Sequence, residues 1–416
     1  MSGYATNGMN QVAQGTQLTG AELLALDTQI TNGTQPQTYA ASVDQLSLYS
    51  KVSPGGMVAF RNLLDGGDFS TSPWQRGTAT PGGTITTTVT YTADRWFAFG
   101  TLANTNVNVS RQALTAGTYP GIGHVLRFGR ASGATGVGTC ILGQALETVR
   151  SRPAQGCYVL LSFYAQAGAG FATATGAGLS GTLGVTLVSG TGTDQASTLI
   201  SPISTGWTGQ TTINSVAAGV VGAVSSVSVT GTTLTRYYVL GKMPAAATQL
   251  AVLFSYAPGG TAAANEYVEL ADIQLEVVSN NATQANAAGY ATSVEKRDVQ
   301  TDLDLCQRHF FQQAEGSAGI VAGTGQSFTA TTGRVFIPFP VQMRVAPTVT
   351  TTIGTFAITN AAGTGQTITT LAAVASNTSV NGASLNVTTS GTVTAGNGAL
   401  LIGAAGTGAI VATADL

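Results

Sequence analysis

Charged side chains are scarce in this chain of 416 residues, which has only 16 Lys and Arg and 18 Asp and Glu. The formal net charge is -2, and no cluster of Lys or Arg creates a local basic field, so the composition excludes nucleic-acid binding. Few charges also leave little to oppose edge-to-edge pairing of strands. We therefore expect identical chains to cover much of each other's surface in an intertwined oligomer.

Cysteine and histidine are also rare. Cys140, Cys157 and Cys306 are odd in number and show no CxxC spacing, which argues against a disulfide framework and against a metal or redox site. We expect them to be buried thiols. His124 and His309 fall in different predicted domains, which argues against a zinc site or a His-based catalytic triad within one chain. The sequence thus predicts neither a metal nor a cofactor.

Long apolar runs are missing, since no stretch reaches the roughly 18 apolar residues of a membrane helix. The N-terminal sequence MSGYATNGMNQVAQGTQ lacks the basic segment and apolar core of a signal peptide. The Gly-rich tract at 168–178 lacks the Lys-Ser/Thr ending of a phosphate loop and predicts a surface loop. We expect a protein made in a cytosol, with no membrane insertion.

Residues 294–313 differ from the rest of the chain, because seven of these twenty residues are charged. Val299, Leu303, Cys306 and Phe310 are spaced 4, 3 and 4 apart without intervening Gly or Pro, which predicts one face of a short amphipathic helix. In one interpretation this helix is either the neck between two β domains or, through these four residues, the seam of a trimer. In the other it is a connector helix packed on its own domain.

Residues 1–56 predict an N-terminal arm. Residues 1–16 are polar and small, which is typical of an extended segment. Residues 18–49 fit either a short helix plus a turn or two brief strands around Asn32-Gly33. This stretch is too small for a core of its own and must dock on something else. The Pro-Gly-Gly sequence at 54–56 marks the first domain boundary.

Residues 57–281 alternate between β-branched or aromatic runs and turn residues, which favours an antiparallel β-sandwich or jelly roll. Residues 197–233, rich in Ser, Thr, Gly, Val and Ala around Trp207, fit either strands or a long loop. The predicted strands are 85–91, 95–99, 107–109, 125–128, 158–164, 183–187, 234–240, 250–256 and 267–275.

Residues 282–316 form the predicted linker and helical neck, and residues 317–416 a second β-rich domain at the distal end. Strands are expected at 334–339, 346–353 and 356–358. Pro338, Pro340 and Pro347 restrict them to short or edge strands. Small residues dominate the last fifty positions, so we expect this last segment to fold only against copies of itself.

Several segments resemble modules of tailed-bacteriophage fibre and virion proteins. NLLDGGDFSTSPWQRGT, YTADRWFAFG and ELADIQLEVV (62–78, 91–100 and 269–278) resemble their jelly-roll modules, which are distantly similar to carbohydrate-binding modules. DLDLCQRHFFQ and FIPFPVQMRVAPTVT (302–312 and 336–350) resemble their neck and C-terminal domain. LTGAELLALDT and GTQPQT (18–28 and 33–38) are similar to modules at the start of such fibres.

This resemblance implies a structural protein of a virion, a homotrimeric fibre attached through residues 1–56 to tail or capsid proteins. It also implies weak adhesion to host-surface glycans, strengthened by three copies per fibre. A capsid decoration protein or head fibre that stabilises the shell is the alternative. A polysaccharide-degrading tailspike would need a groove with clustered carboxylates, which this charge-poor chain barely supplies.

Two sets of side chains are candidates for chemistry. The carboxylates are Asp65, Asp68, Asp94, Asp272 and Glu276. Asp272 and Glu276 lie four apart on one strand, about 13 Å on the same face, which is too far for a glycosidase pair. We interpret all five as groups that cap turns or pair with Arg. Calcium at Asp65 or Asp68, as in similar sugar-binding modules, is the alternative.

The aromatic candidates are fewer. Trp96 lies within an aromatic run and is expected in the core. Trp74, beside Arg76 in a predicted loop, is the expected exposed ring, and these two residues are the candidate ligand contacts. We predict no catalytic residue and no enzymatic activity.

Overall fold

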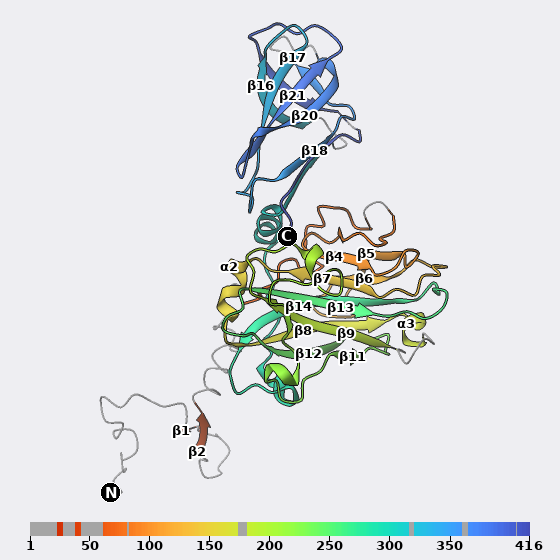
Figure 1. The fold of residues 1–416 in the computed structure, drawn as a ribbon, viewed down its shortest axis with the longest axis vertical. Coiled ribbons are helices and arrows are strands. Elements are labelled where there is room, and N and C mark those ends of the chain that lie inside the picture. The colour runs from red at the N-terminus through yellow and green to blue at the C-terminus, as the bar shows by residue number, and fades with distance from the viewer. Residues whose placement is uncertain are drawn as a thin grey trace, which may run out of the picture. The chain divides into compact units, whose positions relative to one another are not determined.

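The computed structural model describes residues 61–80, 83–173, 181–315, 320–359, 365–404 and 406–416, together with strands β1 (Leu23–Asp27) and β2 (Thr38–Ser42) (Figure 1). The chain divides into two compact units, Met1–Phe60 and Arg61–Leu416. In the first unit β1 and β2 pair antiparallel, so of the two interpretations of residues 18–49 the structure has the strands. The rest of the predicted arm lies outside the described residues.

Two antiparallel sheets form a β-sandwich, as the alternation predicted. One sheet has seven strands in the order β10-β9-β13-β7-β4-β3, with β11 also paired to β9, and the other has five in the order β12-β8-β14-β6-β5. The strands of the first sheet are β3 (Thr90–Tyr91), β4 (Phe97–Gly100), β7 (Cys140–Ala145), β9 (Thr182–Gly190), β10 (Thr211–Thr212), β11 (Ser226–Ser228) and β13 (Gln249–Tyr256). Those of the second are β5 (Val107–Ala113), β6 (His124–Arg130), β8 (Tyr158–Ala167), β12 (Thr235–Lys242) and β14 (Tyr267–Val278).

The sandwich core is rich in aromatic side chains. Alternate residues of β8 face it, including Val159, Leu161 and Phe163, because successive side chains of a strand point to opposite faces. The Phe163 ring meets Phe254 edge to face at a centroid distance of 4.9 Å. Trp96 is fully buried beside Phe254, as predicted.

The observed strands differ from the predicted ones at two places, and in a third stretch, residues 197–233, the sequence fits either strands or a loop. β7 was not predicted, because all six of its residues are buried and the strand therefore lacks alternation. Of residues 85–91 only Thr90–Tyr91 is a strand, while Ile85 makes an isolated bridge with Val107. Residues 197–233 are mostly loop, with the short β10 and β11.

Helices are few and short in the part of the chain that the structure describes, and none is long and apolar enough to cross a membrane. Helix α5 is Val299–Gln307, shorter than the helix predicted through Phe310, which instead begins strand β15 (Phe310–Ala314). The remaining helical segments are α2 (Thr148–Ser151), η1 (Arg152–Ala154), α3 (Ala169–Thr173), η2 (Ser197–Leu199), η3 (Val216–Ala218), η4 (Gln284–Asn286) and α4 (Ala287–Tyr290).

The C-terminal strands form a closed six-stranded barrel in the order β16-β17-β21-β20-β19-β22. A separate three-stranded sheet has the order β15-β23-β18. The barrel strands are β16 (Ile320–Ser327), β17 (Thr332–Pro338), β19 (Ala357–Thr359), β20 (Gly365–Ser379), β21 (Gly382–Thr389) and β22 (Gly398–Gly403). The others are β18 (Thr348–Thr352) and β23 (Ala409–Thr413).

The barrel has a core within one chain. Val335, Ile337, Phe356, Leu385 and Leu401 are at most 1% exposed and belong to one buried cluster. The last fifty residues thus share a core with earlier strands of the same chain, and the expectation that they fold only against copies of themselves is wrong. Closing the strands into a barrel encloses even small side chains and leaves no free edge among the barrel strands.

Candidate functional site: the charged junction

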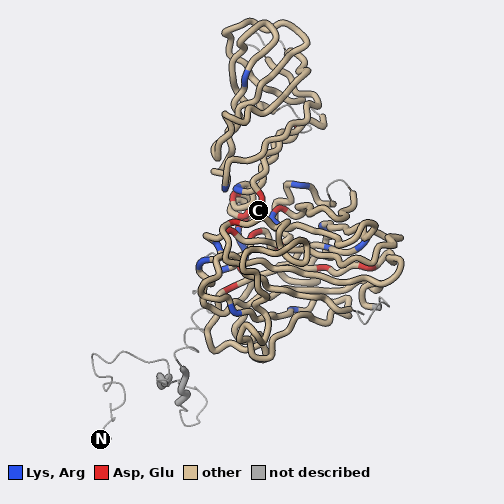
Figure 2. Tube along the Cα trace, in the orientation of Figure 1, with Lys and Arg blue, Asp and Glu red and all other residues tan. Residues whose placement is uncertain are grey.

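Ion pairs concentrate where α5 and the C-terminal residues meet the sandwich. Figure 2 shows the blue and red segments gathered around this helix and the C-terminus. We call this network the charged junction. It comprises Asp65, Asp68, Arg76, Asp94, Arg95, Glu147, Arg150, Asp194, Asp272, Glu295, Lys296, Arg297, Asp302, Arg308, His309, Arg344 and Asp415.

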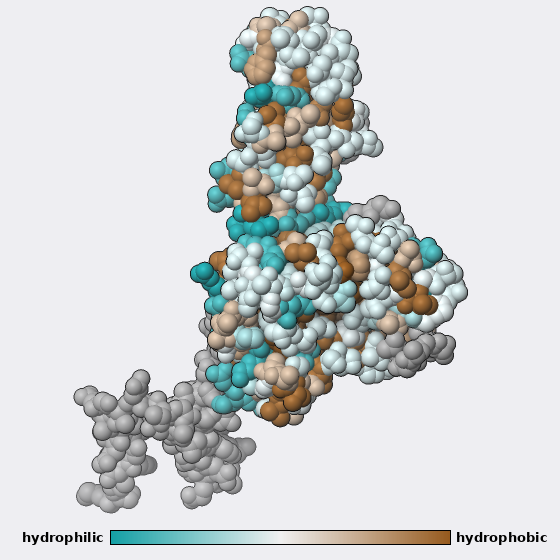
Figure 3. Space-filling view, viewed as in Figure 1, coloured by the Kyte–Doolittle hydropathy of each residue, from teal (hydrophilic) through white to brown (hydrophobic). Residues whose placement is uncertain are grey.

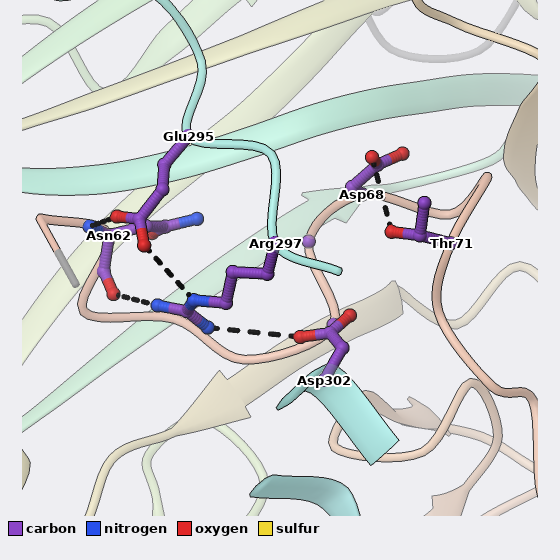
Figure 4. Close-up of a pocket in the computed structure, with 8 residues that line it drawn as sticks. Asn62, Asp68, Thr71, Glu295, Arg297 and Asp302 are labelled. Carbon is purple, nitrogen blue, oxygen red and sulfur yellow. Dashed lines mark hydrogen bonds and ion pairs between the residues drawn. The ribbon is translucent and has the colours of Figure 1, made fainter. Parts of the chain in front are cut away.

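Arg297 is the hub of the junction (Figure 4). Its guanidinium donates to the Asn62 backbone oxygen at 2.6 Å and to the Leu64 oxygen at 3.1 Å. It also pairs with Glu295 at 3.2 Å and lies 3.8 Å from Asp302. Glu295 in turn accepts from the Asn62 amide at 2.7 Å. The residual cavity beside this hub is about 10 Å³, room for about one water molecule, so the hub is a packed structure and not a ligand pocket.

The Asp65-Gly-Gly-Asp68 turn is shaped for close contact with β14. A Cβ atom at Gly67 would lie only 2.2 Å from the Ile273 oxygen, so no larger residue fits without moving the backbone. Gly66 has a φ of +61°, a conformation that glycine adopts at little cost. Asp65 pairs with Arg150 at 2.9 Å and with Arg297 at 3.2 Å.

Lys296 lies between two carboxylates that the sequence offered as catalytic or calcium-binding candidates. Its ammonium is 3.1 Å from Asp68 and 2.5 Å from Asp272. Asp272 has a φ of +49° and falls in the irregular stretch of β14 between Ala271 and Gln274. Among the described residues no group of three or more His, Cys, Asp or Glu is placed to hold a metal ion. The Lys296 ammonium thus neutralises Asp68, one of the two residues for which calcium was the alternative interpretation.

The other carboxylate candidates cap turns. Asp94 accepts from the backbone amides of Trp74 at 2.7 Å and Gln75 at 2.9 Å. Burial raises the pKa of Asp94, although these hydrogen bonds oppose it. Glu276 accepts from Thr292 through both the amide and the hydroxyl. The five carboxylates therefore cap turns or pair with cations, but the partner of Asp272 is Lys296 and not the arginine that the interpretation expected.

Glu147 of the sandwich joins the end of α5. Arg308 donates to its carboxylate at 2.8 Å, and His309 Nε2 lies 2.9 Å from it. Burial alone would raise the pKa of Glu147, but the hydrogen bonds from His309 and Arg308 outweigh it and hold that pKa well below its usual range. Burial, reinforced by Arg95, lowers the pKa of His309 to about 4 despite Glu147. His309 is therefore neutral at pH 7 and donates from Nε2.

Asp302 and Cys306 are the buried residues of α5. Burial raises the pKa of Asp302 to about 6, against the attraction of Arg297. Burial also raises the pKa of the Cys306 thiol well above its usual value. Asp298 caps the helix by accepting from the Thr301 amide at 3.0 Å. Helix α5 therefore packs on the sandwich with Asp302 and Cys306 enclosed.

The C-terminal residues bind the sandwich as well. Asp415 accepts from Arg76 at 2.5 Å, and the Arg76 guanidinium lies 3.7 Å from the centre of the Phe310 ring. The Leu416 oxygen accepts from the Tyr91 hydroxyl at 2.8 Å. Arg344 donates to the backbone oxygens of residues 414 and 415. The residues that follow β23, the central strand of the β15-β23-β18 sheet, thus lie against the sandwich and not at a distal tip.

The predicted ligand contacts occupy interior positions. Trp74 is 5% exposed, and its indole donates to the Phe69 oxygen at 3.2 Å, so the expectation of an exposed ring is wrong. The Thr71 hydroxyl donates to the Asp68 carboxylate. The tight turn that this bond closes precedes Trp74 and directs its ring inward. Arg76 serves the junction, with 12% of its side chain exposed.

The predicted seam is divided. Val299 is 56% exposed, and Leu303 is partly exposed, whereas Cys306 and Phe310 are buried within the chain at 1% and 5%. Because α5 packs on the sandwich, the last two positions are already covered, and the helix behaves as the connector of the second interpretation. Of the thiols, Cys140 and Cys306 are buried as expected, but Cys157 is partly exposed.

Sequence reasoning marked residues 294–313 by their charge but assigned no partner to Lys296, Arg297 or Arg308. Their partners Asp65, Glu147 and Asp272 lie far away in the sequence, so no spacing could join them. The concentration of charge in one segment of a charge-poor chain was the available signal.

No protein-family model matches the sequence, and no curated protein matches it. Several solved structures resemble part of the chain. A candidate sugar binding protein from Bacteroides thetaiotaomicron aligns over 52% of this chain and 99% of its own, with 13% identity and a TM-score of 0.30. The enzymatically active domain of tailspike protein 4 from bacteriophage CBA120 aligns over 53% of this chain, with 11% identity and a TM-score of 0.28.

The chain spans only 22% of that tailspike structure. A CBM4 structure aligns over 44% of this chain and 87% of its own, with 13% identity and a TM-score of 0.27. These similarities are distant, and at such TM-scores none of the three proteins indicates what this chain binds or does.

Proposed function

We propose that the chain is a non-enzymatic structural protein of a bacteriophage particle, made in the host cytoplasm and assembled as a homotrimeric fibre. Residues 1–56 attach it to tail or capsid proteins. The trimer holds the host surface through weak glycan contacts that multivalency strengthens. The bacteriophage particle is proposed because segments of the sequence resemble modules of phage fibre and virion proteins.

The observation that carries the proposal is the use of charge in the junction. Among the described residues most ion pairs join the sandwich to the residues that flank α5 or to Asp415, while Arg127–Glu269 and Arg130–Glu266 lie elsewhere in the sandwich. Side chains fixed in this way hold parts of the chain together and are not free for proton transfer. A mechanical role suits a chain in which the few charged side chains form ion pairs between its own parts.

A polar row on the five-stranded sheet supports glycan binding. Glu269 lies opposite Arg127 on β6 and opposite Gln166 on β8, and it accepts from both at 2.6 and 2.5 Å. The Arg127 guanidinium stacks 3.8 Å from the centre of the Tyr267 ring, and 34% of its side chain is exposed. Planar polar groups beside an aromatic ring suit the hydroxyls and CH faces of a sugar.

The experiment has two parts, each with the full chain. Antibodies against the protein locate it in electron micrographs of purified particles: a fibre on the tail supports the proposal, and a uniform cover on the shell supports the decoration alternative. Absence from particles contradicts both.

Adhesion of the purified protein to host cells is measured next, with Arg127→Ala as the test variant. The exposed Arg152 provides the matched control Arg152→Ala. We expect adhesion to drop at least tenfold for Arg127→Ala only. Equal adhesion of both variants would remove the polar row as the glycan contact.

A further inference from the structure

An apolar face covers three neighbouring barrel strands. Phe336 on β17 lies opposite Thr324 on β16, and Thr324 lies opposite Leu400 on β22. Phe336 and Leu400 are 46% and 41% exposed, and Val321 on the same side of β16 is 59% exposed. We call these residues, with Pro338, the apolar barrel face. Exposed apolar side chains scattered singly are ordinary, but three on adjacent strands form a patch.

A hollow adjoins this face. It has a volume of about 410 Å³, within the range of pockets that accept several apolar side chains. The two prolines of its wall have no backbone N–H to offer, which makes the wall more apolar still. It is lined by Phe311, Gln312, Gln313, Val321, Ala322, Pro338, Phe339 and Pro340.

The surroundings of the face are almost uncharged. Residues 317–416 contain only three charged side chains, Arg334, Arg344 and Asp415, and the last two belong to the junction. Figure 3 shows the barrel surface mostly white, with brown patches and smaller teal ones. A charged partner would have to bury its charges here without counterparts, which is costly. An uncharged partner with apolar side chains meets no such penalty.

We propose that the apolar barrel face binds the hollow of a second copy of this chain. Each copy offers both projecting side chains, Phe336 and Leu400, and the hollow that receives them. The face and the hollow share Val321 and Pro338, but the projecting Phe336 and Leu400 do not line the hollow. The projecting side chains and the hollow are therefore unlike patches, and contacts between unlike patches of identical chains form a ring when the rotation closes. The inference rests on the trimer of the proposed function and assigns its seam to the barrel, since α5 has already buried Cys306 and Phe310 in its own chain.

The first test measures the mass of the full chain in solution by light scattering at about ten micromolar, a concentration chosen for ordinary oligomers. We expect three times 41.8 kDa. Phe336→Asp should weaken association at least tenfold, because it places a charge in the contact. Val216→Asp is the control, since Val216 is 73% exposed on the sandwich, and it should leave the mass unchanged.

A second test covers the case in which Phe336→Asp does not fold. A photo-crosslinking amino acid replaces the exposed Val321 in the otherwise native chain. Crosslinks between chains into residues 311–340 or 398–403 support the inference. Crosslinks only within one chain, or into residues 1–60 of either copy, overturn it.

The outcomes separate this inference from the proposed function. A wild-type trimer that survives Phe336→Asp overturns the barrel seam alone. A wild-type monomer overturns the seam together with the trimer, whereas the place of the protein in the particle is judged by the micrographs and not by its mass.

Discussion

The sandwich and the barrel are stabilised by different kinds of side chain. The sandwich core contains Trp96, Phe69, Phe163 and other fully buried aromatic side chains. In the barrel core Phe356 is the one aromatic among the buried residues that the structure describes. Large rings bury much apolar area per residue, whereas the barrel gains order by closing its hydrogen-bonded strands. The comparison teaches that a segment of small residues can enclose a core when its topology is closed.

The largest expected effect compares the two cores directly. Trp96→Ala should lower the free energy of unfolding by about 3 to 5 kcal/mol, because the indole is fully buried and donates to the Gly66 oxygen at 3.1 Å. Leu401→Ala, at a fully buried barrel position, should cost about 2 to 3 kcal/mol, since fewer large neighbours contact it. Denaturant titration followed by circular dichroism measures both.

Tryptophan fluorescence sharpens this result, because all three tryptophans lie in residues 74–207 and report on the sandwich. If the junction couples the two parts, Leu401→Ala shifts the fluorescence and dichroism transitions together. Val216→Ala serves as the exposed control. An equal or larger loss for Leu401→Ala than for Trp96→Ala would break the distinction between the cores.

The same contrast decides how much could be predicted. The sandwich strands were mostly predicted, since runs such as Tyr158–Ala167 alternate between core and outer face. In the barrel, β16, β20, β21 and β22 were not predicted. Thr, Ala, Gly and Asn dominate β20, and such residues carry little apolar contrast between the two faces of a strand. Closure arises from pairings such as β16 with β22, which are distant in the sequence.

The site was predictable only in part. The charge of residues 294–313 marked the segment that joins the sandwich, and the carboxylates were correctly given structural roles. Trp74 was misplaced because a loop sequence does not reveal that its ring turns inward onto Phe69. The stripe at Val299, Leu303, Cys306 and Phe310 has the spacing of both a seam and a connector, and only the packing of α5 on the sandwich separates them.

The second prediction concerns the junction between the two parts. The folded pKa of His309 lies below its ordinary value, so the unfolded chain binds a proton first and stability falls as the pH drops from about 6.5 towards 4. The folded pKa of Asp302 lies above its ordinary value, so stability rises as the pH drops from about 6. Between pH 7 and pH 5 the free energy of unfolding loses roughly 2 kcal/mol through His309 and gains roughly 1 kcal/mol through Asp302. The two changes partly cancel.

Removing one group should therefore expose the other. Asp302→Asn removes the gain from Asp302 and keeps the loss from His309. The loss of stability from pH 7 to pH 5 should therefore roughly double, from about 1 to about 2 kcal/mol. His309→Gln should reverse the sign, because the His309 loss no longer opposes the gain from Asp302. The exposed Asp304 on the same helix supplies the control Asp304→Asn. Chemical denaturation at both pH values gives the answer, and parallel profiles for all four proteins would contradict it.

The smallest expected change in stability tests the surface difference between the two parts. Arg334 on β17 donates to Asn386 at 3.0 Å and is the only charged residue of 317–416 outside the junction. Arg334→Ala should alter the free energy of unfolding by less than about 0.5 kcal/mol. Association should nevertheless rise, because the barrel surface then has no charge to oppose contact between apolar faces. Arg152→Ala, on the sandwich, removes the same charge where others remain, so light scattering over a concentration series should detect added association for Arg334→Ala alone. Equal scattering by the two variants would mean that charge on the barrel does not limit its association.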